Sequence, residues 1–452
     1  MLRTKTRRAG LLMTTLLPVL LHCSLVEAQT PPPAFPDAKQ SDPQANGLMQ
    51  GFPPPPDKTV RLGDGSASKF PATRWGMNHL RELMPSADVS RGEGPVALLP
   101  REERDLGSVK FTTMDGASMN FEDALQKTYA DGIVVLHKGK IVYERYFGAG
   151  APQRPHTAFS LTKSFVGTLA TMLIFEGKLD AAAPVTKYVP ELQSSAYGDV
   201  TVRQALDMLV NAKYSENYSD PNAEIWNYSR AGGWIPLRPD YTGPRTYYDF
   251  LVTLQKQGEP GETFAYNTVT AEVLAWIVKR ATGERLADLL SEKIWSKIGA
   301  EKDAYFVVDS IGTESGGGGL ATTLRDVARF GETMRNKGQF NGQQIIPAPV
   351  VEDIMKGGDK EIFAKAGYKT LPGWSYRAFW WVTNNPHAAY MARGIHGQSL
   401  YIDPQAETVI ARYASHPVAG NPFNDPITLP AYAAVADELM RSAARADNRD
   451  AK

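Results

Sequence analysis

The sequence predicts a protein of the α/β class, more specifically α+β, in which strands from both ends of the chain form one antiparallel sheet flanked by helices. Three observations support this prediction. Strand-like segments precede residue 160, helical patterns occupy most of residues 160–300, and strand-like segments return after residue 378. A helical middle between two groups of strands is typical of a sheet with a mostly helical lobe inserted into it.

The first group of strands is marked by β-branched and aromatic residues around short turns. Residues 109–112 predict a strand, and residues 121–128 predict a helix after it. Residues 133–136 and 141–146 are rich in valine, isoleucine and tyrosine and flank a lysine-glycine-lysine turn. We therefore expect a β-hairpin shortly before the helical part of the chain.

The middle and the end of the chain differ in their hydrophobic periodicity. After a buried helix that starts at Ser160, the helical segments are 201–209, 247–255, 270–281 and 323–337. Strands are then predicted at 379–382, 399–402 and 408–413, before a last helix over 429–444. The main domain is expected to cover residues 74–452, with the helical lobe over about residues 165–310.

The N-terminal segment has the pattern of a secretory signal peptide over residues 1–28. Basic residues precede an apolar run from Leu11 to Leu21, and small residues near Ala28 suit cleavage. Because this run is shorter than a membrane span, we expect an exported protein, periplasmic or secreted, without stable membrane insertion. Residues 29–73 are rich in proline and predict a poorly ordered linker.

The composition argues against several classes of function. The chain has 49 Lys+Arg and 49 Asp+Glu, so its formal net charge of zero gives no indication of a nucleic-acid partner. Its one cysteine, Cys23, falls within the predicted signal peptide, and the histidines are scattered, so no metal site is expected. The four glycines at 316–319 predict a turn rather than a phosphate loop, and no cofactor is expected.

A serine and a lysine at the start of the central helix carry the first chemical signal. Ser160 and Lys163 are three residues apart, so they share one face of the helix. The helix behind them is apolar on nearly every side, and burial lowers the pKa of a lysine toward that of a base. A helix start also offers free backbone N–H groups for an anion. The alternative interpretation of Ser160 is an N-cap, and a second Ser-x-x-Lys match at 66–69 is interpreted as solvated coil.

Further motifs follow the Ser-x-x-Lys segment in a defined order. They are Gly177-Lys178-Leu179-Asp180, Pro184-Val185-Thr186-Lys187-Tyr188-Val189-Pro190, Tyr266-Asn267-Thr268 and the segment from Gly318 to Phe330. Together they resemble the serine β-lactamase and penicillin-binding-protein superfamily in its class C-like and esterase branch. The segments 214–221 and 394–398 are most similar to those of 6-aminohexanoate-oligomer hydrolases. The resemblance covers roughly residues 75–445.

This resemblance implies a role for each catalytic candidate. Ser160 is expected to be the nucleophile that forms an acyl-enzyme, and Lys163 its general base. Tyr266 matches the tyrosine that shares protons with that lysine and protonates the leaving group. The alternative interpretation of Tyr266 is a core aromatic with a bonded hydroxyl.

Three further residues are expected to contact the substrate. Tyr218 matches a tyrosine of the oligomer hydrolases that would form a hydrogen bond with the scissile amide. Glu216 is a candidate for holding a substrate ammonium, and Asn267 is a candidate for a contact to a substrate amide. The alternative for Tyr218 and Glu216 is an ordinary exposed loop.

The third motif of the superfamily, Lys-Thr-Gly, is replaced by other residues. The candidate segment is 392–395, in which Gly394 permits close approach and the N–H of Ile395 joins that of Ser160 in an oxyanion hole. His396 would form a wall or a polar contact. An alternative register starts at His396 and would turn the Gln398 nitrogen toward Ser160. The missing lysine favours an esterase or amidase over a lactamase, unless Arg393 points inward.

The function predicted from these residues is an exported serine hydrolase that cleaves a small-molecule linear amide or ester through an acyl-enzyme on Ser160. One alternative is a β-lactamase or D-Ala-D-Ala carboxypeptidase. A second is a sensor that keeps the fold without turnover. A Ser-His-Asp hydrolase is disfavoured, because the chain contains no Gly-x-Ser-x-Gly elbow.

Overall fold

The computed structural model describes residues 35–450, although the side chains of residue 444 and residues 446–450 are not described. The predicted signal peptide, residues 1–28, lies outside this range, as do residues 29–34 of the predicted linker. Between residues 35 and 450, no helix is both long and apolar enough to cross a membrane.

Helices and strands follow one another along the described chain largely as the sequence predicts. The α-helices are α1 (Ala72–Gly76), α2 (Phe121–Lys127), α3 (Leu161–Phe175), α4 (Val202–Leu206), α5 (Glu224–Ala231), α6 (Tyr247–Leu251), α7 (Thr268–Thr282), α8 (Leu286–Leu290), α9 (Leu324–Arg335), α10 (Ala348–Lys356), α11 (Lys360–Ala364) and α12 (Asp425–Asp450). The strands are β1 (Ser86–Val89), β2 (Lys110–Thr112), β3 (Ser118–Asn120), β4 (Ala130–His137), β5 (Lys140–Tyr146), β6 (His156–Thr157), β7 (Ala304–Val307), β8 (Leu320–Thr322), β9 (Gln339–Phe340), β10 (Gln343–Gln344), β11 (Ser375–Arg377), β12 (Trp380–Val382), β13 (Tyr390–Gly394), β14 (Gln398–Asp403) and β15 (Thr408–Ala414).

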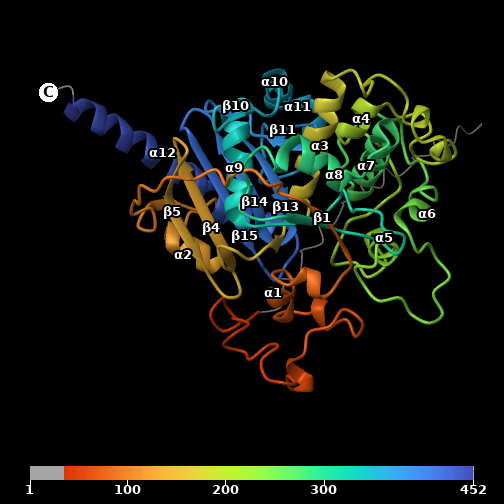
Figure 1. The fold of residues 1–452 in the computed structure, drawn as a ribbon, viewed down its shortest axis with the longest axis horizontal. Helices are drawn as coiled ribbons and strands as arrows, with labels where there is room; N and C mark the ends of the chain where they lie inside the picture. Colours follow the sequence, from red (N-terminus) through yellow and green to blue (C-terminus); the bar gives the residue numbers. More distant parts are fainter. Residues whose placement is uncertain (1–34, 451–452) are drawn as a thin grey trace, which may run out of the picture. The chain divides into compact units, whose positions relative to one another are not determined.

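The main sheet has seven antiparallel strands in the order β11-β12-β13-β14-β15-β4-β5 (Figure 1). Strands β4 and β5 come from the first part of the chain, and the other five come from its last part. The two groups meet where β15 pairs with β4, with Ile410 opposite Val135. The prediction of one antiparallel sheet completed by both chain ends is therefore confirmed.

Helices cover both faces of this sheet. A Cβ on Gly331 of α9 would lie 2.7 Å from the Leu400 side chain, so Leu400 faces α9. The next residue of β14, Tyr401, packs against Tyr432 of α12 with 5.7 Å between ring centroids. Because successive side chains of a strand point to opposite faces, α9 and α12 cover opposite faces of the sheet.

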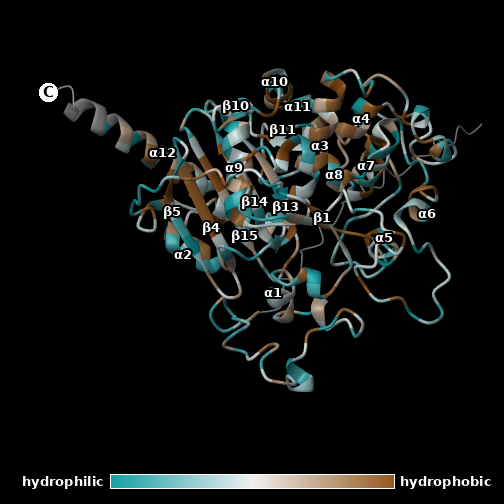
Figure 2. Ribbon diagram, in the orientation of Figure 1, coloured by the Kyte–Doolittle hydropathy of each residue, from teal (hydrophilic) through white to brown (hydrophobic). Residues whose placement is uncertain are grey.

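The core lies between the sheet and the helix that follows β6. Residues 133–136 of β4 are fully buried, and Figure 2 shows that β4 and α3 are strongly hydrophobic. Phe165 of α3 stacks on Phe330 of α9 with 4.0 Å between ring centroids. The predicted buried helix after Ser160 is thus confirmed as a central element of the fold.

A second sheet, in the order β1-β7-β8-β6, brings distant segments to the start of α3. The N–H of Ala158, just after β6, donates to the carbonyl of Leu320 in β8 at 2.9 Å. In return, the Leu320 N–H donates to the hydroxyl of Thr162 in α3 at 3.1 Å. The glycine turn 316–319 directly precedes β8, so this pairing places the turn beside the start of α3.

Some predicted elements differ in length from the observed ones. Helix α6 ends at Leu251, whereas the hydrophobic periodicity of the sequence predicts a helix that continues to residue 255. The carbonyl groups of Leu254 and Gln255 accept hydrogen bonds from the N–H groups of Ala196 and Lys213, which draws this backbone out of the helix. Tertiary hydrogen bonds therefore override the local helical pattern here.

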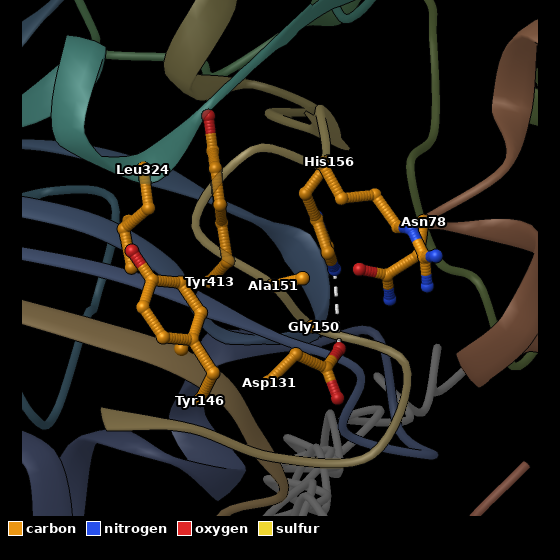
Figure 3. Close-up of a pocket in the computed structure, with 10 residues that line it drawn as sticks. Asn78, Asp131, Tyr146, Gly150, Ala151, His156, Leu324 and Tyr413 are labelled. Carbon is orange, nitrogen blue, oxygen red and sulfur yellow. Dashed lines mark hydrogen bonds and ion pairs between the residues drawn. The ribbon is translucent and has the colours of Figure 1, made fainter. Parts of the chain in front are cut away.

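The segment 35–73 is irregular, as its prolines suggest, but it differs from the loose linker expected there. The Arg74 side chain, 1% exposed, donates from Nη1 to the Ser41 hydroxyl at 3.0 Å. Its Nη2 lies 3.2 Å from the Asp131 carboxylate of β4. The other oxygen of Asp131 lies 3.1 Å from His156 Nε2, as Figure 3 shows. Hydrogen bonds to Arg74, which is itself buried and paired with Asp131, thus hold this segment against the main domain.

Candidate active site

Ser160 lies at the junction of β6 and α3 in an unusual local conformation. The preceding residue, Phe159, has φ of 44°, in the left-handed region that non-glycine residues rarely adopt. Such a conformation costs on the order of 1–3 kcal/mol and persists only where the surroundings impose it. Ser160 is 8% exposed and its side chain makes no capping hydrogen bond to the helix. Ser160 thus occupies the N-cap position of α3, but its hydroxyl does not cap the helix and is left free for other contacts.

The Lys163 side chain is almost fully buried, at 1% exposed, and its amine has three hydrogen-bond contacts. Nζ lies 2.7 Å from Ser160 Oγ, 2.6 Å from the Gly317 carbonyl oxygen and 3.1 Å from the Thr268 hydroxyl. Burial lowers the pKa of Lys163 to about 8, although the negative charges of Glu216 and Glu272 oppose this shift. The structure thus gives the lysine the pKa direction that the buried helix predicts.

Tyr266 lies two residues before α7 and faces the same two side chains. The Lys163 Nζ is 5.1 Å from the centroid of its ring, which packs against Trp381 at 5.4 Å. Burial and the charge of Glu216 raise the pKa of Tyr266, while hydrogen bonding with Ser160 lowers it. The net shift is upward, so the phenol stays protonated at neutral pH.

Of the two residues after Tyr266, it is Thr268, and not the predicted site residue Asn267, that contacts Lys163 and Glu216. Asn267 is 5% exposed and precedes α7 as its N-cap residue, but its side chain makes no capping hydrogen bond. Thr268 contacts the site directly, since its hydroxyl accepts from Lys163 and its N–H donates to the Glu216 carboxylate. Sequence reasoning missed Thr268, although its place as third residue of the tyrosine motif could have indicated it.

Glu216 and Tyr218 are partly buried in the loop between α4 and α5 and are not fully exposed. The Glu216 carboxylate accepts from the first N–H of α7 and is turned toward Lys163. Burial raises the pKa of Glu216, and Lys163 lowers it. Tyr218 packs edge-on against Trp226 with 6.1 Å between ring centroids. Burial raises the pKa of Tyr218, and the charge of Glu216 raises it further. Both residues are therefore close enough to influence groups of the site.

The end of β13 lies directly against the segment that leads into Ser160. A Cβ on Gly394 would lie 2.7 Å from the Ala158 carbonyl oxygen, so only glycine fits this approach without displacement. Ile395 follows at the start of a short 3-10 helix, η7 (Ile395–Gly397). Gln398 is already part of β14, where its side chain bonds to the backbone of Ala414 in β15. The structure therefore brings the Gly394 end of β13 against Ala158, two residues before Ser160.

His396 is held by the backbone of the 416–419 segment. It adopts φ of 62°, its N–H donates to the Ala419 carbonyl at 2.9 Å, and its Nδ1 lies 2.7 Å from the His416 carbonyl. Because a carbonyl oxygen can only accept, Nδ1 carries the proton. Burial lowers the pKa of His396 to about 4, so Nε2 is an unprotonated acceptor at neutral pH. The ring packs against Phe159 at 5.4 Å, which makes it a wall of the Ser160 region.

Arg393 does not supply the free cation that a Lys-Thr-Gly motif would provide. Its side chain is 5% exposed and forms an ion pair with the Asp425 carboxylate. Its guanidinium also lies 5.1 Å from the Trp381 ring and 5.7 Å from the Trp374 ring. The charge of Arg393 is therefore already neutralised within the protein.

Comparison with known proteins identifies the family of this chain. Residues 120–433 match the protein family described as Beta-lactamase. The chain is 36% identical over 353 residues to the 6-aminohexanoate-dimer hydrolase of Paenarthrobacter ureafaciens, covering 78% of this chain and 88% of that protein. Within residues 35–450, no group of three or more His, Cys, Asp or Glu residues is placed to hold a metal ion.

Two solved structures show how far the fold is shared. A Bacillus anthracis protein assigned as a 6-aminohexanoate-dimer hydrolase superposes with a TM-score of 0.78 at 32% identity, covering 84% of this chain and 97% of that one. EstCE1, a hydrolase with promiscuous acyltransferase activity, has a TM-score of 0.56 at 15% identity over 70% of this chain and 98% of its own, and shows the fold alone. The chain therefore belongs to the Beta-lactamase family of serine hydrolases.

Proposed function

We propose that this protein is an exported hydrolase that cleaves a linear amide or ester through an acyl-enzyme on Ser160, with Lys163 and Tyr266 as general base and acid. The observation that carries the proposal is the 2.7 Å contact between Lys163 Nζ and Ser160 Oγ at a buried site. A lysine with a pKa of about 8 is partly neutral near physiological pH, so it can accept the serine proton.

The contacts of Lys163 support proton transfer from the Ser160 hydroxyl to the amine. A neutral amine has two N–H groups and one lone pair. The Gly317 carbonyl can only accept, so it takes one N–H, and the Thr268 hydroxyl can accept the other. The lone pair is then left for the Ser160 hydroxyl, which donates its proton as Oγ forms a bond to the substrate carbonyl carbon.

The remaining steps follow from the neighbouring groups. The tetrahedral oxyanion would receive hydrogen bonds from the N–H groups of Ser160 and Ile395. When the bond to the leaving nitrogen or oxygen breaks, Tyr266 would donate its proton to the leaving group and regain one from the Lys163 ammonium. Water then attacks the acyl carbon with the same groups acting in reverse, which releases the acid and restores Ser160.

The surroundings of Ser160 support an amide or ester substrate rather than a lactam with a carboxylate. The only candidate cation on β13 is Arg393, and Asp425 already neutralises it. We assign the Tyr218 hydroxyl to a hydrogen bond with the scissile amide, and His396 Nε2 to a hydrogen bond with a polar group of the substrate. Asn267 stays a candidate for an amide contact. Glu216 is turned toward Thr268 and Lys163, so we assign it to tuning the lysine rather than to holding an ammonium.

Active-site labelling tests this proposal. A fluorophosphonate probe should modify the purified protein at Ser160, as read by peptide mass spectrometry, and Ser160→Ala should abolish both labelling and hydrolysis of 6-aminohexanoate dimer and p-nitrophenyl esters. We expect a loss of roughly 10⁴-fold or more, as for other serine nucleophiles. Ser66→Ala is the matched control, because Ser66 lies in the other Ser-x-x-Lys match. Labelling at Ser66, or rapid nitrocefin turnover without ester or amide cleavage, would contradict the proposal.

Export is tested separately. A protein produced with its full N-terminus should be recovered outside the cytoplasm, and its intact mass should correspond to cleavage near Ala28. Recovery of the uncleaved chain in the cytoplasm would argue against export without affecting the assignment of Ser160.

A further inference from the structure

Glu272 is a buried carboxylate that the proposed acyl-transfer steps do not use. It lies on α7 and is 3% exposed. Its oxygens accept from the Tyr228 hydroxyl at 2.6 Å, the Ser315 hydroxyl at 2.8 Å and the N–H groups of Gly316 at 2.8 Å and Gly317 at 3.0 Å. Among the described residues it forms no ion pair with a cation. Its charge is therefore held by neutral donors, and three of these four come from the Ser315–Gly317 segment.

This segment also contacts the proposed general base. The Gly317 carbonyl accepts from Lys163 Nζ at 2.6 Å, which is shorter than the contacts of Nζ to Ser160 at 2.7 Å and Thr268 at 3.1 Å. The N–H of Gly317 is bonded to Glu272 on one side, and its carbonyl is bonded to Lys163 on the other. A two-bond chain thus connects the carboxylate to the lysine amine.

The glycines of this turn are pressed against α7. A Cβ on Gly317 would lie 2.6 Å from the Thr268 methyl group and 2.8 Å from Glu272 Oε1. A Cβ on Gly316 would lie 2.6 Å from the Cβ of Ala275. No side chain fits at either position without displacement, so the backbone of the turn and α7 form one closely packed unit.

We propose that Glu272 is a positioning residue that holds the Gly316–Gly317 turn against α7, so that the Gly317 carbonyl keeps Lys163 Nζ within reach of Ser160. This inference rests on the proposed function, because it assumes that Lys163 is the base. The titratable and charged groups around Lys163 are Glu216 from the 207–223 loop, Glu272 from α7 and Tyr266 before α7. Only Glu272 is linked to the lysine through the Gly317 carbonyl.

Glu272→Gln tests the proposal with little change in volume. The amide retains one oxygen acceptor, but its NH₂ group would face the N–H of either Gly316 or Gly317, so the turn has to shift. A shift of about 1 Å in a catalytic group can cost about 100-fold in rate, and we expect kcat/KM to fall by about this factor. Loss of the negative charge and of the Gly317 contact both destabilise the protonated form of Lys163, so its pKa should fall. The acid limb of the pH profile, where kcat/KM rises with pH, should therefore move to lower pH.

Glu314→Gln is the matched control. Glu314 is also a buried carboxylate, 1% exposed, and lies one residue before the turn segment. It pairs with Lys279 at 3.1 Å and with Arg285 at 3.2 Å, and it has no contact with Lys163. Its substitution should lower the melting temperature while leaving kcat/KM per folded molecule and the acid limb as in the wild type.

The measurements are the pH dependence of kcat/KM for an ester substrate and the rate of fluorophosphonate labelling at Ser160, both corrected for the folded fraction. A reduced rate with a displaced acid limb in Glu272→Gln alone supports the proposal. A Glu272→Gln protein with wild-type labelling rate and an unshifted acid limb overturns it and leaves Glu272 a purely structural group. If the wild type is not labelled at Ser160 at all, the proposed function fails, and the inference fails with it.

Discussion

Two buried basic side chains in this protein, Lys163 and Arg74, lie in different electrostatic surroundings. Lys163 is surrounded mainly by neutral acceptors, with its nearest contacts to a hydroxyl and a carbonyl, and burial lowers its pKa to about 8. Arg74 lies 3.2 Å from the Asp131 carboxylate. Burial raises the pKa of Asp131, but His156, Arg74 and Ser415 together hold this pKa below its usual value. Both cations are 1% exposed, so burial alone does not distinguish them.

The difference is the distance to the nearest opposite charge. A carboxylate in direct contact keeps the ion pair charged and makes it a fixed link, here between the segment 35–73, β4 and β6. Carboxylates that act only from a distance, as Glu216 and Glu272 do on Lys163, leave the amine able to lose its proton. The same low-dielectric interior therefore supports structure in one place and proton transfer in the other.

The largest expected effect comes from placing a permanent positive charge at position 163. Lys163→Arg should reduce hydrolysis by roughly 10⁴-fold, comparable to loss of the nucleophile, because a guanidinium stays protonated. In the wild type, kcat/KM should rise with pH through an apparent pKa of about 8, since only the neutral amine accepts the serine proton. The measurement is a pH series of ester hydrolysis.

Lys293→Arg serves as the matched control for that change. Lys293 is 9% exposed and bonds directly to the Glu176 carboxylate at 2.9 and 3.0 Å, so a permanent charge suits its position. This variant should retain wild-type hydrolysis. An active Lys163→Arg protein would show that Lys163 is not the general base.

The second prediction concerns the ion pair between Arg74 and Asp131. Asp131→Asn leaves Arg74 buried beside a neutral group, which should lower the free energy of unfolding by about 3–5 kcal/mol. The folded pKa of Asp131 is lowered, so its contribution is present above the unfolded value of about 3.9 and is lost as pH falls through the folded value. Denaturant titrations at neutral and acidic pH measure both effects.

A surface pair provides the comparison for Asp131→Asn. Asp88 lies 2.6 Å from Arg81, but their side chains are 70% and 49% exposed, so Asp88→Asn should change stability by less than about 1 kcal/mol. The acid limb of hydrolysis should stay unchanged in Asp131→Asn. If that limb moves, the Arg74 and Lys163 clusters are energetically coupled and do not act independently.

The smallest expected effect is at the hydroxyl that bridges the ion pair. Ser415 accepts from Arg74 Nε at 2.9 Å and donates to Asp131 at 2.9 Å. Ser415→Ala removes these hydrogen bonds but keeps both charges, so the free energy of unfolding should fall by about 1–3 kcal/mol. A loss as large as that of Asp131→Asn would mean that the hydrogen bonds of Ser415, rather than the charge pair, provide most of the stability of this buried cluster.

The sequence by itself determined the features that depend on short separations. Three residues on one helix place Lys163 beside Ser160 wherever that helix lies in the fold, and the hairpin of β4 and β5 follows from a turn flanked by β-branched residues. Apolar periodicity indicated the buried helix α3 and the strands that complete the sheet. These inferences held because local backbone geometry fixes which neighbours can meet.

Only the tertiary structure decided what surrounds that pair. Thr268 and Gly317 reach Lys163 across separations of 105 and 154 residues, and Arg74 reaches Asp131 across 57. The pairing of Arg393 with Asp425 likewise shows that the residue replacing the lysine of the third motif offers no free charge. Such contacts depend on the path of the whole chain through the core, which no local periodicity encodes. The burial that lowers the pKa of Lys163 depends on the same path.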